Sequence, residues 1–152
     1  MNQPTRQGPF WDMMEGRTPA PPVARLLGWK LQAIDPEQGT IRVEFDARAD
    51  FLNPLGTVQG GILTAMLDDT MGPAAAALLG GDAFAQTLEL KTSFIRAARP
   101  GPLYGEARVV HRGREVVFLE GSLSDADGRL VATASATARV IPFADRSGRP
   151  PS

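Results

Sequence analysis

The sequence predicts an α+β fold in which a six-stranded antiparallel sheet wraps around one long central helix. Three observations predict it. Several stretches alternate apolar and polar residues with a period of two, which is typical of half-buried strands. The longest apolar stretch, around Ile62 to Leu79, follows a glycine turn and is expected to be the helix. The last alternating stretch, 130–140, carries mostly alanine on one face, which leaves room for a thick element against the sheet.

Composition limits the function classes. The chain has 152 residues, a net charge of -1 and no cysteine. This length fits one domain with a real core, and the charge gives no argument for nucleic acid or an anionic membrane. Disulfides, thiol nucleophiles and thiolate metal sites are excluded. A single histidine, His111, excludes histidine-rich metal sites and gives a Ser-His-Asp triad nothing to support it. No metal is expected.

The composition of the two terminal segments predicts that they pack loosely or not at all. Residues 1–22 are rich in proline, glycine and charge and form an arm, with a short helix near 10–15 and apolar anchors at 10–11 and 13–14. The first residues lack the apolar core of a signal sequence, so a cytoplasmic location is expected. Residues 143–152 have nothing to bury and are expected to be a disordered tail. The domain itself is expected over 23–142, starting with a helical turn at 23–27.

The strands follow in order. Trp29, Leu31 and Ala33 alternate, the turn 35–39 follows, and 40–47 alternates with a clean period of two, which together indicate a hairpin. After the helix come 87–94, 103–111, 116–124 and 130–140, separated by turn signals at 112–114 and 125–128. We expect one hairpin before the helix and a four-strand meander after it.

The helix carries two carboxylates. At about 100° per residue, Asp68 falls on a seam of small residues and away from the bulky face. The seam comprises Gly61, Thr64, Gly72 and Ala75, and the bulky face Leu63, Met66, Leu67, Met71 and Leu78. An acid there is costly unless it is paired or used, and the glycine turn upstream offers N–H donors to an oxyanion. Asp69 points about 100° away. Since Pro73 removes the helix bond to its carbonyl, Asp69 is expected to solvate that break.

The chain resembles the hotdog-fold acyl-CoA thioesterases, specifically the phenylacetate-pathway (PaaI-like) type of the hydroxybenzoyl-CoA thioesterase superfamily. The resemblance covers about 23–142, and three stretches carry it. They are Asn-Pro-Leu-Gly-Thr-Val-Gln-Gly-Gly at 53–61 running into Asp68, Thr-Leu-Glu-Leu-Lys-Thr-Ser-Phe-Ile-Arg-Ala-Ala-Arg-Pro-Gly at 87–101, and the pair 109–120 with 127–137.

The resemblance implies a site and a reaction, which is hydrolysis of an acyl-CoA to the free acid and coenzyme A. Gly60 N–H would polarise the thioester carbonyl, and Asp68 would activate water or attack as nucleophile. Asn53 would help to hold the water or thioester, and Thr87 would orient the water. The chain departs from the family at Gln59, where histidine is usual; an amide supplies hydrogen bonds but does not titrate near neutral pH.

Helix geometry adds a condition. Gly60 and Asp68 lie eight positions apart, or about 12 Å along one helix axis, so one thioester cannot easily engage both from the same chain. We therefore expect a site shared by two chains, in a homodimer or homotetramer. The expected substrate contacts are Gly61, Phe51, Leu55 and Met71 near the acyl group, and Arg96, Arg99, Arg112 and Arg114 near the coenzyme A phosphates. No cofactor is expected, since coenzyme A is part of the substrate.

Two other functions compete with hydrolysis on this fold. A non-catalytic acyl-CoA-binding or assembly protein could share the fold, because fold does not imply function, and Gln59 favours this alternative. Asp68 on the seam argues against it, since a binder needs no carboxylate there. A dehydratase or hydratase of this fold pairs a histidine with an acid, and no suitable histidine is present.

Overall fold

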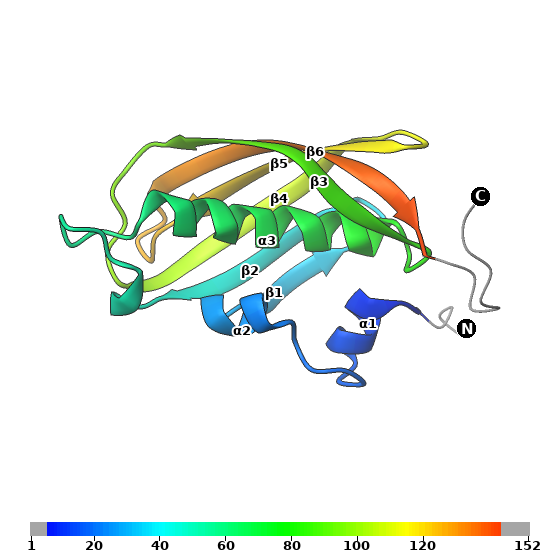
Figure 1. Cartoon of the computed structure of the whole chain (residues 1–152), viewed down its shortest axis with the longest axis horizontal. Helices are drawn as coiled ribbons and strands as arrows, with labels where there is room; N and C mark the ends of the chain where they lie inside the picture. Colours follow the sequence, from blue (N-terminus) through cyan, green and yellow to red (C-terminus); the bar gives the residue numbers. More distant parts are fainter. Residues whose placement is uncertain (1–5, 144–152) are drawn as a thin grey trace.

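The computed structural model describes residues 6–143, and in it a curved sheet wraps around one helix (Figure 1). In chain order the elements are α1 (Pro9–Met14), α2 (Pro22–Leu27), β1 (Lys30–Asp35), β2 (Thr40–Ala47), a 3-10 turn η1 (Ala49–Phe51), α3 (Gly60–Leu78), β3 (Ala83–Phe94), β4 (Gly101–Arg112), β5 (Val116–Ser124) and β6 (Leu130–Pro142). The predicted fold class is confirmed: the sheet has six strands, all its pairs are antiparallel, and α3 lies in its concave side.

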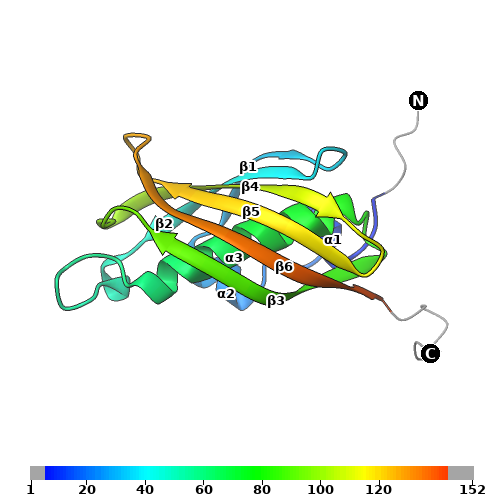
Figure 2. The same cartoon turned by 90° about the horizontal axis from the view of Figure 1, so that it is seen from above.

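The strand order corrects one prediction. The sheet runs β1-β2-β4-β5-β6-β3, so only β4, β5 and β6 form a meander (Figure 2). The expected four-strand meander is wrong because β3 pairs with β6, from Ala83 opposite Pro142 to Phe94 opposite Ala132. The helix α3 crosses the concave side of the sheet, and the chain therefore re-enters the sheet at the edge far from β2. As a result β3 is an edge strand that lies beside α3.

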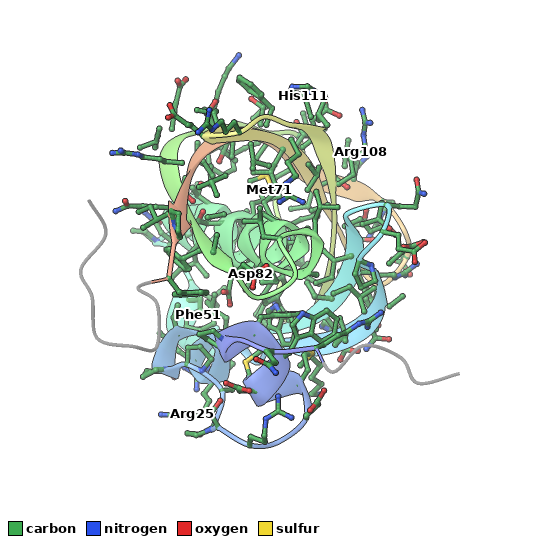
Figure 3. The ribbon with its side chains drawn as sticks, turned by 90° about the vertical axis from the view of Figure 1, so that its right-hand side faces the viewer. Arg25, Phe51, Met71, Asp82, Arg108 and His111 are labelled. Atoms are coloured by element: carbon green, nitrogen blue, oxygen red, sulfur yellow. The ribbon has the colours of Figure 1, made fainter. Side chains whose placement is uncertain are left out.

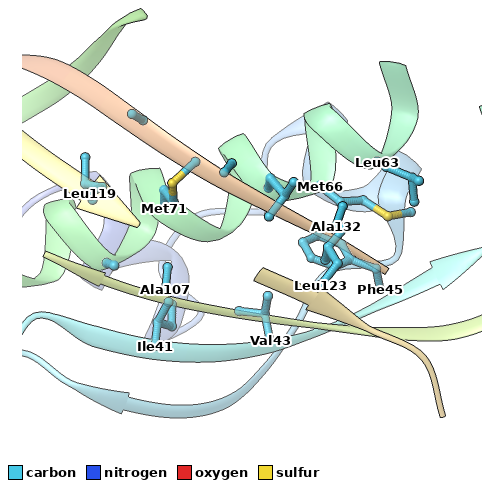
Figure 4. Close-up of a cluster of buried hydrophobic side chains, with 14 of the residues drawn as sticks. Ile41, Val43, Phe45, Leu63, Met66, Met71, Ala107, Leu119, Leu123 and Ala132 are labelled. Carbon is cyan, nitrogen blue, oxygen red and sulfur yellow. The ribbon is translucent and has the colours of Figure 1, made fainter. Parts of the chain in front are cut away.

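The core lies between α3 and the concave face of the sheet (Figure 4). The alternation predicted for β2 is confirmed, since Ile41, Val43, Phe45 and Ala47 are all buried. In β6 the alanines at 132, 134, 136 and 138 are buried, so the predicted small-residue face of this strand points into the core. The bulky face of α3 meets these strands with Leu63, Met66, Leu67 and Met71.

Bulges in β1 and β3 shift the predicted alternation. In β1 the register changes between Leu31 and Ala33, so that Ile34, and not Ala33, becomes half-buried. In β3 the register changes between Thr87 and Glu89, and Leu88 is left 59% exposed. A bulge adds one residue opposite a partner strand and turns the following side chains over. The bulge in β3 lies directly after Thr87, which the family resemblance places in the site.

The arm before the domain packs on the side of α3 that the sheet leaves open (Figure 1). It contains α1, and α2 follows it at the start of the domain; together these two helices bury Trp11, Ala24 and Leu27. Its contact with the turn after α3 is tight, because a Cβ on Gly81 would overlap the Gln7 carbonyl group. Gly81 also has a φ of 92°, which favours glycine. The predicted tail over 143–152 lies, apart from Phe143, outside the described residues.

No helix within residues 6–143 combines the length and the apolar character needed to cross a membrane.

Candidate active site

Asp68 and Thr87 are hydrogen-bonded to each other across the gap between α3 and β3. The Thr87 hydroxyl donates to Asp68 Oδ1 at 2.8 Å, and both residues are exposed. One turn earlier on the same seam, the Thr64 hydroxyl donates to the Thr92 hydroxyl on β3 at 3.1 Å. The seam of small residues on α3 therefore faces the edge strand. The structure brings together these two predicted site residues, which are 19 positions apart in the chain.

The N-terminus of α3 presents free backbone donors. Gln59 is the N-cap, its side chain makes no capping hydrogen bond, and its N–H donates to the Phe51 carbonyl. Helix geometry leaves the N–H groups of Gly60 and Gly61 without an acceptor inside the helix. A Cβ on Gly60 would lie 3.1 Å from Cζ of Phe94, so the Phe94 ring covers this glycine closely. The turn can thus offer an N–H to an oxygen with negative charge.

Asn53 organises the loop before the helix. Its Oδ1 accepts hydrogen bonds from the N–H groups of Leu55 at 2.9 Å and Thr57 at 3.2 Å, and its Nδ2 donates to Thr57 Oγ1 at 2.9 Å. Three of the four hydrogen-bonding positions of the amide are therefore used within the loop. One Nδ2 hydrogen is left for water or a ligand, and the predicted role of Asn53 in holding them stays a prediction.

The helix separates the two halves of the predicted site. Gly60 and Asp68 both belong to the continuous helix α3, so the rise of about 12 Å between them along its axis holds. A base acts on its proton within about 3 Å or through one water. The single chain thus presents an oxyanion donor and a carboxylate that are too far apart to engage one carbonyl group.

A cavity of about 610 Å³ opens beside Asp68 and Thr87. It lies between α3, β3 and the N-terminal arm, and its lining is mostly apolar. Among its described lining residues, only Asp68 and Asp69 have ionisable side chains. The apolar lining residues include Phe10, Met13, Val23, Ala65, Ala76 and Phe84. A volume of this size is typical of a small-molecule pocket.

Asp69 has a different environment from the one expected. Burial and the neighbouring Asp68 carboxylate raise its pKa to about 7, and its Oδ2 is buried without a hydrogen-bond partner among the described residues. The carbonyl that Pro73 frees is satisfied by Trp29, whose indole N–H donates to it at 2.9 Å. The interpretation that Asp69 solvates the helix break is therefore wrong, because Trp29 already does so.

The predicted acyl-pocket residues are scattered. Phe51 and Met71 are 7% and 1% exposed and belong to the hydrophobic core, where Figure 3 shows Met71 pointing from α3 toward the sheet. Leu55 is 87% exposed at the loop tip, and Gly61 faces open space. None of these four lines the cavity. Phe10 and Met13 in the arm do line it. Their apolar character marks them in the sequence as anchors, but the sequence does not indicate which surface they cover.

The four predicted arginines fall into two pairs at opposite ends of α3, and all are exposed. Arg96 and Arg99 flank Ala98, whose carbonyl accepts the Val58 N–H at 2.9 Å just before the helix begins. Arg112 and Arg114 lie at the other end, where Arg112 Nη1 donates to the Leu78 carbonyl at 3.4 Å. A 19-residue helix spans about 28 Å, so one chain does not gather all four.

His111 takes no part in this site. It lies on β4 and points outward from the convex face of the sheet, away from α3 (Figure 3). Its ring lies 6.4 Å from that of Phe118 on the neighbouring strand. Within residues 6–143, no group of three or more His, Cys, Asp or Glu side chains could hold a metal ion.

Comparison with known proteins identifies a matching family and several relatives. A family model described as the thioesterase superfamily matches residues 55–132, which include the α3 N-terminus, Asp68 and Thr87. Among curated proteins, a candidate esterase of Saccharolobus solfataricus is 36% identical over 105 residues, which are 68% of this chain and 74% of that protein.

Solved structures are also similar. The phenylacetic acid degradation-related protein of Ralstonia eutropha JMP134 is 46% identical, with a TM-score of 0.83 over 86% of this chain and 98% of that one. The PaaI protein from the phenylacetic acid degradation operon of E. coli is 20% identical and shares the fold, with a TM-score of 0.77 over 87% of this chain and 93% of that one.

Proposed function

The chain belongs to the thioesterase superfamily, and from its general activity, thioester hydrolysis, we propose that it hydrolyses an acyl-CoA to the free acid and coenzyme A. The observation that carries the proposal is the hydrogen bond from Thr87 to Asp68 at the mouth of an apolar cavity. A carboxylate held in one orientation beside a space for an acyl group is what this hydrolysis needs. A protein that only binds acyl-CoA needs no such pair.

In the proposed reaction, Asp68 acts as general base. The Thr87 hydroxyl donates a hydrogen bond to Asp68 Oδ1. Asp68 takes a proton from water while the water oxygen attacks the thioester carbonyl carbon. The carbonyl oxygen becomes an oxyanion, which accepts a hydrogen bond from Gly60 N–H at the positive end of the α3 dipole. The carbon–sulfur bond then breaks and the coenzyme A thiolate leaves. A thiolate is a good leaving group, so no general acid or cofactor is required.

We place each site between two copies of the chain. The distance along α3 supports this, because Gly60 and Asp68 of one chain cannot serve one thioester. The edge strand supports it too: within residues 6–143 no strand pairs with the outer side of β3, and its Leu88 and Phe94 are 59% and 55% exposed. β3 is a 12-residue edge strand, and the unpaired backbone groups along such an edge can pair with a second chain. A homodimer through β3, or a homotetramer built from such dimers, would complete the site.

Such a dimer would also bring the two arginine pairs together. If the α3 helices of the two copies run antiparallel, the N-terminal end of one helix lies toward the C-terminal end of the other. Arg96 and Arg99 of one copy would then share a site mouth with Arg112 and Arg114 of its partner. Arginine suits the phosphates of coenzyme A, because its guanidinium binds phosphate oxygens in a bidentate manner.

The test is a thiol-release assay on a panel of short, medium and aromatic acyl-CoAs, with Asp68→Asn beside the wild type. We expect the substitution to lower kcat by two or more orders of magnitude, typical for loss of a general base. Asp82→Asn, which changes an exposed aspartate at the turn after α3, should match the wild type. Near-normal turnover by Asp68→Asn would show that Asp68 is not the general base. Tight acyl-CoA binding without turnover by the wild type would establish the non-catalytic binder instead.

A further inference from the structure

We propose that Thr64 lies on the two-fold axis of the dimer, where it contacts the partner's Thr64. This contact sets the register that brings Gly60 of each chain opposite Asp68 of the other. Thr64 is therefore a positioning residue, which acts through the two helices and does not touch the substrate. The inference rests on the shared site of the proposed function, and it adds the contact that holds the two halves of that site together.

The place of Thr64 follows from the symmetry of a homodimer. Contacts across a two-fold axis are reciprocal, so that if one residue meets a second residue of the partner, the second also meets the first. Gly60 opposite the partner's Asp68 therefore implies Asp68 opposite the partner's Gly60, with the two α3 helices antiparallel. The position midway between them meets its own copy. That position is Thr64, which lies four residues after Gly60 and four before Asp68.

Thr64 lies on the face of α3 that a partner joining at β3 would meet. Its hydroxyl donates to the Thr92 hydroxyl on β3, and one turn later on the helix Asp68 accepts from Thr87 on the same strand. Since β3 is the edge strand beside α3 (Figure 2), the seam of small residues runs along the edge where a second sheet would join. Two such seams can approach each other closely.

The hydroxyl of Thr64 points away from its own helix. A threonine inside a helix often donates to the carbonyl four residues back, as Thr70 does to the Met66 carbonyl at 2.7 Å. Thr64 donates to Thr92 on the edge strand instead. Two hydroxyls that share one hydrogen bond have one proton left, whichever of them donates. The side-chain hydrogen bonds within residues 6–143 leave that proton unused, and the same pair of hydroxyls in the partner supplies an acceptor at the axis.

Charge and space favour a second copy in this register. Asp68 is exposed, and no cation of residues 6–143 forms a salt bridge with it. The register places each Asp68 carboxylate toward the positive N-terminal end of the partner's α3. At that end a Cβ on Gly61 would meet open space, and its φ is not positive, so nothing in its own chain requires glycine there. The missing side chain leaves room for the partner's Asp68 and a thioester between the helices.

Cysteine cross-linking tests the proposal, because the chain has no cysteine of its own. Thr64→Cys would place two thiols at the axis, and a disulfide requires Cα atoms within about 7 Å of each other. Gly72→Cys is the matched control, since it lies on the same seam with open space for a side chain. In an antiparallel pair centred on Thr64, the two copies of position 72 are about 24 Å apart along the helices. Under oxidation with copper phenanthroline, Thr64→Cys should become a covalent dimer and Gly72→Cys should not.

The activity of the cross-linked protein distinguishes the native register from a chance collision. Oxidised Thr64→Cys should release thiol from acyl-CoA at about the rate of the reduced form, because the disulfide locks the register that the site uses. Thr64→Ser keeps the size and the hydroxyl and should retain most of kcat. Thr64→Leu should lower kcat by roughly tenfold or more while the protein stays dimeric in size-exclusion chromatography, since a displacement of about 1 Å is enough to misplace the reacting groups.

Three results would overturn the proposal. They are cross-linking of Thr64→Cys no faster than that of Gly72→Cys, loss of activity on oxidation of Thr64→Cys, and turnover by Thr64→Leu equal to that of the wild type. If the wild type releases thiol from no acyl-CoA, the proposed function fails, and the cross-linking still decides whether Thr64 lies on the axis.

Discussion

The Thr87 hydroxyl on β3 donates a 2.8 Å hydrogen bond to Asp68 Oδ1 on α3. This bond fixes the orientation of the carboxylate and leaves its other oxygen for water. It also ties the edge strand to the helix at the β3 bulge, where the register changes between Thr87 and Glu89. The bulge thus sets which residue of β3 reaches the carboxylate.

Thr87→Val should lower kcat/KM for acyl-CoA by roughly tenfold or more, because Asp68 loses the hydrogen bond that orients it. Valine keeps the shape and the strand preference of threonine. Thr87→Ser keeps the hydroxyl and should retain most of the activity. Thiol-release kinetics on folded protein, checked by circular dichroism, measure both variants. Equal rates for the valine and serine variants would show that the hydroxyl has no part in the reaction.

Trp29→Phe should destabilise the protein more than Trp11→Phe does. Both substitutions remove the same part of a ring. Only Trp29 loses a hydrogen bond, the one to the Asp69 carbonyl, whereas the buried Nε1 of Trp11 has no partner among the described residues. Leaving that carbonyl unpaired costs about 1–3 kcal/mol. Denaturant unfolding of the two variants measures the difference, and equal losses would contradict the capping role of Trp29.

The stability of the wild type should fall as the pH rises from about 4 to about 7, through the titration of Asp69. Burial and the Asp68 charge raise the pKa of Asp69 from 3.8 to about 7, so the folded state holds a proton that the unfolded state has released. The contribution is fully present below pH 4 and is lost above pH 7, with an upper bound of about 4 kcal/mol.

Asp69→Asn is the matched variant for that titration, since it cannot ionise. Thermal unfolding at pH 5 and pH 8 should show the wild type losing free energy of unfolding relative to Asp69→Asn at the higher pH. A constant difference between the two proteins over this range would mean that Asp69 titrates normally.

Gly81→Ala should loosen the N-terminal arm from the turn after α3. Its Cβ would overlap the Gln7 carbonyl group, and its φ of 92° disfavours any side chain. Gly80→Ala is the control, because Gly80 has a φ of 71° but open space around its Cβ position. We expect both variants to lose about 1 kcal/mol from backbone strain, and Gly81→Ala to lose more. Limited proteolysis should cut the arm faster in Gly81→Ala alone.

Much of the fold follows from local patterns. The period of two in β2 and the alanine face of β6 predict strands that each bury one face, and the structure bears out both. The pairing of β3 with β6 does not follow from them, since a strand that follows its neighbour in sequence is usually its neighbour in space. That pairing depends on the path of α3 across the sheet, which no short stretch of sequence encodes.

The candidate site was predictable in part. The helix pattern and the family resemblance both point to Asp68, whereas Thr87 rests on the resemblance alone. The helix angle correctly puts Asp68 on the seam. The angle could not reveal that Trp29 caps the break before Pro73, because this contact joins residues 40 positions apart. Nor could it show that the arm covers a cavity beside Asp68. Phe51 and Met71 are apolar residues near the motif, and such residues more often belong to the core than to a pocket.

The central claim is that each site takes Gly60 from one copy and Asp68 from the other. Gly60→Pro removes the N–H at a helix position that tolerates proline, and Gly60→Ala keeps the N–H as the control. As homodimers, Gly60→Pro and Asp68→Asn should each lose about a hundredfold or more in turnover.

The most direct measurement is the turnover of a purified heterodimer of Gly60→Pro and Asp68→Asn, isolated through two different affinity tags. One of its two sites would combine an intact Gly60 with an intact Asp68, and the other would carry both changes. The shared site predicts about half of the wild-type rate per dimer. A heterodimer as inactive as the two homodimers would contradict it.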